Sequence, residues 1–85
     1  MSEGPIKILE ESLEKFVFVR LRGGKKLRGK LEGFDQHLNL LLEEAADITD
    51  AEETRSLGTI ILRGDNVIII SLSPKIYWVL PHNIN

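Results

Sequence analysis

The chain contains no cysteine and, in 85 residues, only two histidines and 6% aromatic residues. Disulfides and thiolate zinc sites both need cysteine, so we exclude a disulfide-stapled secreted miniprotein and a cysteine nucleophile, and expect a cytoplasmic protein. The two histidines, His37 and His82, are too far apart in sequence to form a metal-ligand motif. No apolar run approaches the roughly 20 residues of a membrane-spanning helix, so we expect no membrane partner.

Motifs of catalysis are also missing. No serine lies in a nucleophile elbow, and Gly23-Gly24-Lys25-Lys26 lacks the earlier glycine and the following Ser or Thr of a phosphate-binding loop. We therefore expect a non-enzymatic protein without catalytic residues, cofactor or metal. The acidic N-terminal stretch lacks the order of a signal peptide, which predicts that the chain is mature as written.

A chain this short buries only about 60% of the surface that it exposes when unfolded, so it is limited to a single domain with a thin core. Without disulfides or a metal, oligomerisation is the usual remaining source of stability. We expect one domain over residues 1–73, followed by a C-terminal extension over 74–85 that is bounded by prolines and has no assigned role.

The net charge of -2 conceals an uneven distribution. The acidic residues crowd into 10–14 and 43–53, whereas six of the 11 basic residues lie between positions 20 and 30. Most of these cations alternate with apolar residues, which is compatible with a solvated outer surface or with a face that contacts phosphates. The six are Arg20, Arg22, Lys25, Lys26, Arg28 and Lys30.

The hydrophobic period predicts a short helix followed by five strands. Pro5 suits a first helical position, and Ile6, Leu9 and Leu13 share one face of a helix over about 5–15. From Phe16 the period changes to two, as in strands with one buried side. The expected strands are 16–22, 25–34, 37–43, 54–63 and 66–72, with an acidic loop over 45–53 and the last two strands joined as a hairpin.

Two features of these strands predict curvature and association. Gly29 and Gly33 lie within or at the end of the second strand, where glycine usually marks a sharp bend. The apolar runs 60–62 and 67–70 do not alternate, so both of their faces, or one face and a paired edge, need cover. An 85-residue monomer has little material for this, and we expect a second subunit to supply it.

Two of the expected turns, 34–39 and 62–66, carry side chains suited to binding. The flat side chains of His37 and Arg63 can sandwich a base, while Asn39 can offer a donor and an acceptor to the edge of a pyrimidine. Such a set suits a base of single-stranded RNA.

Each of these residues also has a simpler interpretation. His37 alone would serve as an ordinary surface histidine, and Asn39 could bond its own backbone. Asp35 and Asp65 are common turn formers, and Arg63 could simply pair with Asp65. Only the combination favours RNA.

The same turns and their flanking strands resemble the Sm-like (Sm/LSm) family. Its first motif is similar to LRGGKKLRGKLEGFDQHLNLLL over 21–42, and its second to ILRGDNV over 61–67. The resemblance spans roughly 10–73. The His-x-Asn form of the first motif and the short loop over 46–53 are most similar to archaeal members.

The resemblance implies the mainly β Sm fold, an N-terminal helix on a strongly bent five-stranded antiparallel sheet that forms an SH3-like open barrel, with Gly29 permitting the bend. It also implies a ring, usually heptameric, in which the fourth strand of one subunit pairs with the fifth strand of the next. Further Sm-like subunits or RNA-processing proteins are the other implied partners.

The resemblance also implies a uridine pocket. His37 and Arg63 would stack on the base, Asn39 would bond its edge, and Asp35 would orient Asn39. The second loop would take its shape from Gly64 and Asp65. The implied RNA-binding residues are Asp35, His37, Asn39, Arg63, Gly64 and Asp65.

The leading hypothesis is a ring-forming protein that binds U-rich single-stranded RNA at its pore and acts as a scaffold or chaperone in RNA processing or ribonucleoprotein assembly. The alternative is a small β-barrel protein-interaction or assembly module in which RNA binding is secondary. The acidic helix and loop and the aromatic tail motivate this alternative. Tyr77 and Trp78 of that tail can stack on bases or pack against protein.

Overall fold

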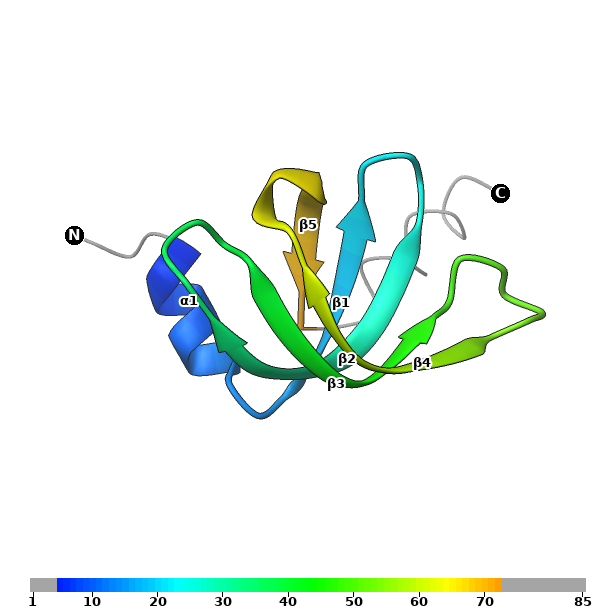
Figure 1. The fold of residues 1–85 in the computed structure, drawn as a ribbon, viewed down its shortest axis with the longest axis horizontal. Helices are drawn as coiled ribbons and strands as arrows, with labels where there is room; N and C mark the ends of the chain where they lie inside the picture. Colours follow the sequence, from blue (N-terminus) through cyan, green and yellow to red (C-terminus); the bar gives the residue numbers. More distant parts are fainter. Residues whose placement is uncertain (1–4, 73–85) are drawn as a thin grey trace.

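The computed structural model describes residues 5–72 and shows one short helix followed by five antiparallel strands in a single bent sheet (Figure 1). The strand order is β4-β3-β2-β1-β5. This confirms the mainly β fold with an N-terminal helix, while the expected extension over 74–85 lies outside the described residues. The elements are α1 (Pro5–Ser12), β1 (Phe16–Leu21), β2 (Lys26–Phe34), β3 (Leu40–Asp47), β4 (Arg55–Leu62), the 3-10 turn η1 (Gly64–Asn66) and β5 (Val67–Ser71).

Helix α1 ends at Ser12, earlier than the predicted end near residue 15. The Ser12 hydroxyl donates to the Ile8 carbonyl at 2.8 Å, and Glu14 then adopts a φ of 66°. The backbone N–H of Glu14 donates to the Leu31 carbonyl at 2.7 Å, which joins the end of the helix to β2. Of the predicted apolar face, only Leu9 enters the core, while Ile6 and Leu13 remain exposed.

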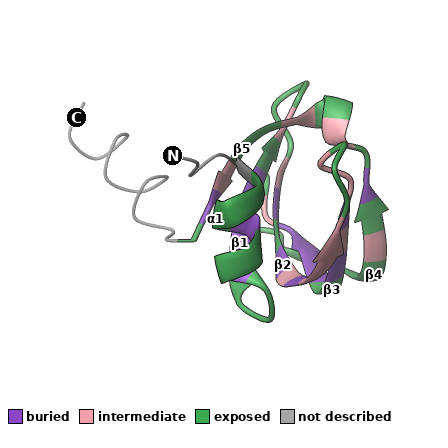
Figure 2. Ribbon diagram, turned by 90° about the vertical axis from the view of Figure 1, so that its left-hand side faces the viewer, coloured by how far each residue is buried: buried purple, intermediate pink, exposed green. Residues whose placement is uncertain are grey.

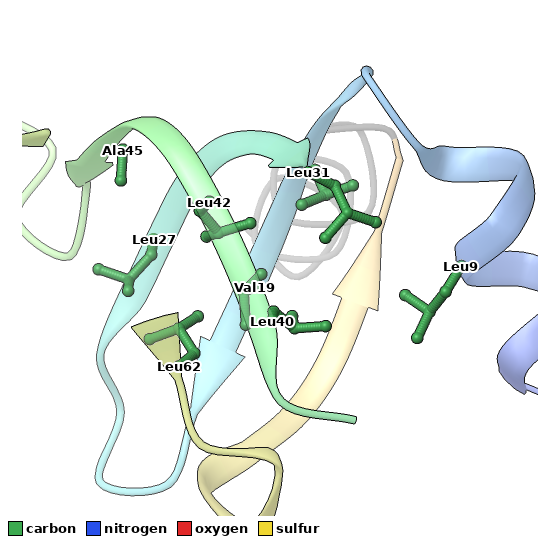
Figure 3. Close-up of a cluster of buried hydrophobic side chains, with 9 residues drawn as sticks. Leu9, Val19, Leu27, Leu31, Leu40, Leu42, Ala45 and Leu62 are labelled. Atoms are coloured by element: carbon green, nitrogen blue, oxygen red, sulfur yellow. The ribbon is translucent and has the colours of Figure 1, made fainter. Parts of the chain in front are cut away.

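The core fills the concave side of the sheet, where alternate residues of β1, β2 and β3 meet (Figure 3). Val17 and Val19 of β1 are fully buried, as are Leu31, Leu40 and Leu42 of β2 and β3. Figure 2 shows the buried positions on these strands and a mostly exposed surface on α1. The predicted period-two pattern is therefore confirmed on β1 and β2.

Strand β2 bends where Gly29 lies directly against β3. A Cβ at Gly29 would lie 3.0 Å from Cβ and 3.1 Å from Cδ1 of Leu42. The pairing of β2 with β3 shifts register at Gly29, between Arg28 and Lys30, and again between Leu31 and Gly33. The missing side chain and the bulges together let β3 fold over β2, as expected from glycine in a strand.

The prediction for the third strand is wrong in its bounds. Strand β3 begins at Leu40, three residues later than predicted, and continues to Asp47 through part of the predicted acidic loop. Glu44 has a φ of 53° and marks a register shift against β4, after which Ala45 and Ala46 are buried. The bulge interrupts the alternation, and the sequence pattern therefore resembles the end of a strand.

The predicted pairing of the last two strands is also wrong. Strands β4 and β5 follow one another through η1, but β4 pairs with β3 and β5 pairs with β1. They form the two opposite edges of the open sheet. Ile61 on β4 and Ile68 on β5 are 72% and 57% exposed, so each of these two edges carries an uncovered apolar residue.

The packing at Gly29 predicts a specific loss of stability. Gly29→Ala places a methyl group against Leu42 and should lower the free energy of unfolding by about 1–3 kcal/mol through overpacking. Gly33→Ala is the matched control, because its Cβ would meet Leu41 only at 3.9 Å, an ordinary contact. Urea unfolding at equal protein concentration measures both. Equal losses in the two variants would contradict the proposed role of Gly29.

Candidate nucleic-acid interface

Two loops from distant parts of the chain meet at one end of the barrel. Residues 35–39 connect β2 to β3, and residues 63–66 connect β4 to β5. A Cβ at Gly64 would overlap the carbonyl oxygen of His37 and lie 2.9 Å from the carbonyl carbon of Leu38. Glycine is therefore required for the two loops to touch. All six residues predicted for the site lie in these loops.

The Asp35 carboxylate organises the first loop. Its Oδ1 accepts hydrogen bonds from the backbone N–H groups of His37 at 2.8 Å and Asn39 at 3.1 Å, and its Oδ2 accepts one from Asn39 Nδ2 at 2.9 Å. These bonds, the side-chain bond from Asn39 first among them, lower the pKa of the Asp35 carboxyl below its usual value. The turn that they stabilise places Leu38 at a φ of 64°.

The Asn39 amide joins the two loops. Its Nδ2 donates to Asp35, and its Oδ1 accepts from the backbone N–H of Gly64 at 2.7 Å. A carboxylate only accepts and a backbone N–H only donates, so the amide has one permitted orientation. One hydrogen on Nδ2 and one lone pair on Oδ1 remain for a ligand, in a fixed order.

Arg63 and Asp65 border the same surface but are loosely held. Arg63 Nε lies 3.7 Å from Asp65 Oδ1, and both side chains are at least 70% exposed, so this ion pair contributes little. An open depression of about 480 Å³ lies between the loops, lined by His37, Asn39, Arg63, Gly64 and Asp65. The structure thus brings five of the six predicted residues to one surface, while Asp35 supports Asn39.

Arg22 is a member of the site that the sequence analysis assigned only to the basic stretch. Its Nη2 and Nε lie 3.2 and 3.4 Å from the Asp65 carbonyl oxygen, to which they donate. Its backbone N–H donates to the Asn66 carbonyl at 2.8 Å. Arg22, the residue directly after β1, therefore supports the second loop. No local signal could have indicated this, because the contact joins residues 43 positions apart.

The arrangement can bind a flat ring that carries hydrogen-bonding groups. His37 and Arg63 supply planar side chains, and the Asn39 amide supplies a donor and an acceptor between them. Planar stacking combined with contacts to a base edge is the way single-stranded nucleic acids are bound. The chemistry of these loops therefore suits a nucleobase.

The lowered pKa of Asp35 predicts how the first loop responds to acid. Because the folded state lowers this pKa, the hydrogen bonds to His37 and Asn39 persist above the folded pKa and are lost as pH falls through it, below 3.8. In NMR titrations, the amide protons of both residues should share a midpoint below 3.8. Asp35→Asn should abolish that transition. A midpoint above the usual value would contradict the geometry.

The chain is similar to known proteins over a range that includes both loops and all five strands. The LSM domain family model matches residues 7–72, nearly all of the described chain. An Sm-like protein from Methanococcoides burtonii is 44% identical over 71 residues, which are 84% of this chain and 99% of the relative.

Two solved structures are also similar. A heptameric archaeal Sm protein superposes with a TM-score of 0.75 at 44% identity, over 80% of this chain and 98% of that one. The Sm protein of Pyrococcus abyssii, solved in complex with a uridine heptamer, superposes with a TM-score of 0.78 at 44% identity, over 84% of this chain and 100% of that one. The chain belongs to the LSM, or Sm-like, family.

Proposed function

We propose that the chain binds U-rich single-stranded RNA in the depression between its two loops. The observation that carries the proposal is the Asn39 amide, which Asp35 and Gly64 restrict to one orientation in a depression bordered by His37 and Arg63. The complex of the Pyrococcus abyssii Sm protein with a uridine heptamer supports the choice of base.

The fixed amide also explains how uracil would be preferred. Uracil presents a carbonyl acceptor beside the N3–H donor, which matches the remaining Nδ2 hydrogen and Oδ1 lone pair of Asn39. Cytosine presents a donor and an acceptor in the reverse order. Since the amide cannot turn over without breaking its bonds to Asp35 and Gly64, a cytosine stacked in the same way would leave both groups unpaired.

We further propose that copies of the chain form a ring through the free edges of β4 and β5. The support is the apolar surface on both edges, together with the heptameric state of the archaeal Sm protein that is 44% identical. Repetition of one weak site around a heptamer would convert modest affinity per base into avidity. Such a ring would act in the cytoplasm as a non-enzymatic scaffold or chaperone in RNA processing or ribonucleoprotein assembly.

The base preference is tested with labelled oligouridine and oligocytidine of equal length. The wild type should bind oligouridine more tightly. His37→Ala and Arg63→Ala should each weaken oligouridine binding about fivefold or more, because each removes a stacking surface. Lys7→Ala, at an exposed cation on α1, should leave binding unchanged. Equal affinities for both oligomers in all four proteins would refute the proposed pocket.

The ring is tested by native mass spectrometry of matched aspartate variants. The wild type should be a heptamer, and Ile68→Asp should give mostly monomer because it places a charge on the edge of β5. Ile8→Asp, on α1 at nearly equal exposure, should remain a ring. A monomeric wild type that ignores RNA would instead favour a protein-interaction module.

A further inference from the structure

The outer face of the β1–β5 pair carries exposed apolar side chains. Val17 and Val19 of β1 point into the core, so Phe16 on the same strand points away from it. Ile69 of β5 lies opposite Arg20 of β1 and also points away from the core. Phe16 is 42% exposed, and Ile69 is 39% exposed. The surface called here the β1–β5 outer face consists of Phe16, Arg20 and Ile69.

Strand β5 ends beside this face. The antiparallel register pairs Ser71, the last residue of β5, with Phe18 of β1. Phe16 is two residues further along β1, a distance of roughly 7 Å at the usual rise of a strand. The sequence continues from this point with residues 73–85, which lie outside the described range. The β1–β5 outer face is therefore within reach of the segment that follows β5.

The sequence of this segment suits the face in direction and length. It opens with Ser73-Pro74, a dipeptide that favours the start of a turn and so a return over β5. Five uncharged and largely apolar residues follow at 76–80, with the sequence IYWVL, before Pro81. In an extended conformation five residues span about 17 Å, which exceeds the separation of roughly 13 Å between Phe16 and Arg20 on β1.

The chemistry of the face also favours an apolar and aromatic occupant. Arg20 is exposed, and within residues 5–72 it lies in no ion pair with a carboxylate. A guanidinium is attracted to the face of an aromatic ring, and most strongly to that of tryptophan. The stretch 76–80 supplies Trp78 together with aliphatic side chains for Phe16 and Ile69. An acidic partner would satisfy Arg20 alone.

We propose that residues 76–80 pack on the β1–β5 outer face of their own chain, with Trp78 between Phe16 and Arg20. The contact buries apolar surface on both sides. It also holds β5 against β1, which is the only strand that β5 pairs with in the described chain. The aromatic side chains of the extension then pack against protein and are not available to stack on RNA bases.

The fluorescence of Trp78 tests the packing directly, because the chain has one tryptophan. In the full-length wild type, its emission should lie at shorter wavelength than in urea, and acrylamide should quench it less. Phe16→Asp should shift the emission to longer wavelength and increase quenching. The aspartate would lie opposite Lys30, so the strand pair should persist, as circular dichroism can verify.

The matched control is Ile8→Asp, which introduces the same charge at an exposed apolar residue of α1. It should leave the emission and quenching of Trp78 unchanged. Equal emission in Phe16→Asp and Ile8→Asp would overturn the proposal. Emission of the native wild type at the wavelength seen in urea would overturn it as well.

Two further measurements distinguish other occupants of the face. Monomers, obtained by dilution and by Ile61→Asp on the opposite edge of the sheet, should retain the wild-type emission of Trp78. A shift to longer wavelength on dissociation would assign the face to a neighbouring copy and overturn the proposal. Oligouridine should leave the emission of Trp78 unchanged, and quenching by oligouridine would overturn the proposal in favour of an RNA contact. A wild type that is itself monomeric would refute only the ring.

Discussion

The Asn39 amide, bonded on one side to the Asp35 carboxylate and on the other to the Gly64 backbone, is the contact on which the candidate site depends. It joins two loops that are 25 residues apart in sequence. It also fixes the order of the donor and acceptor that remain for a ligand. Gly64 makes the contact possible, because a side chain there would collide with the backbone of the first loop. The same contact therefore determines both the geometry of the site and the packing of the two loops.

The segment 63–66, which carries Arg63 and Gly64, also links the site to the two free edges of the sheet. Strand β4 ends at one edge, and the chain passes through residues 63–66 before β5 begins at the other. Arg63 and Gly64 are thus supplied by the segment that separates the two edges. In an assembly through these edges, each copy would bring its loops to an equivalent position. The chain is too small to bury a large core by itself. Contact between the edges of neighbouring copies would bury additional apolar surface and would also repeat the binding site.

The sequence predicted the helix, the strands of the core and the two turns that carry the candidate site, because alternation and turn residues are local properties; the full set of site residues came from the family resemblance. It failed where the determining contacts are distant. The turn at 64–65 indicates a reversal of the chain but not which strands pair on either side of it. The bulge at Glu44 interrupts the alternation of apolar and polar residues, so the sequence pattern did not predict the second half of β3. Arg22 contacts the site by donating to the Asp65 carbonyl in the second loop, and the charge of Arg22 alone could not predict this contact.

The account is tested most directly by chemical modification of the uracil edge. Methylation at N3 removes the hydrogen that would be donated to Asn39 Oδ1 and leaves the stacking faces of the base in place. Oligo-N3-methyluridine should bind roughly tenfold or more weakly than oligouridine of equal length, because a matched hydrogen-bonding group loses its partner. Equal affinities would mean that the base is held by stacking alone, and would contradict the central role of the fixed Asn39 amide.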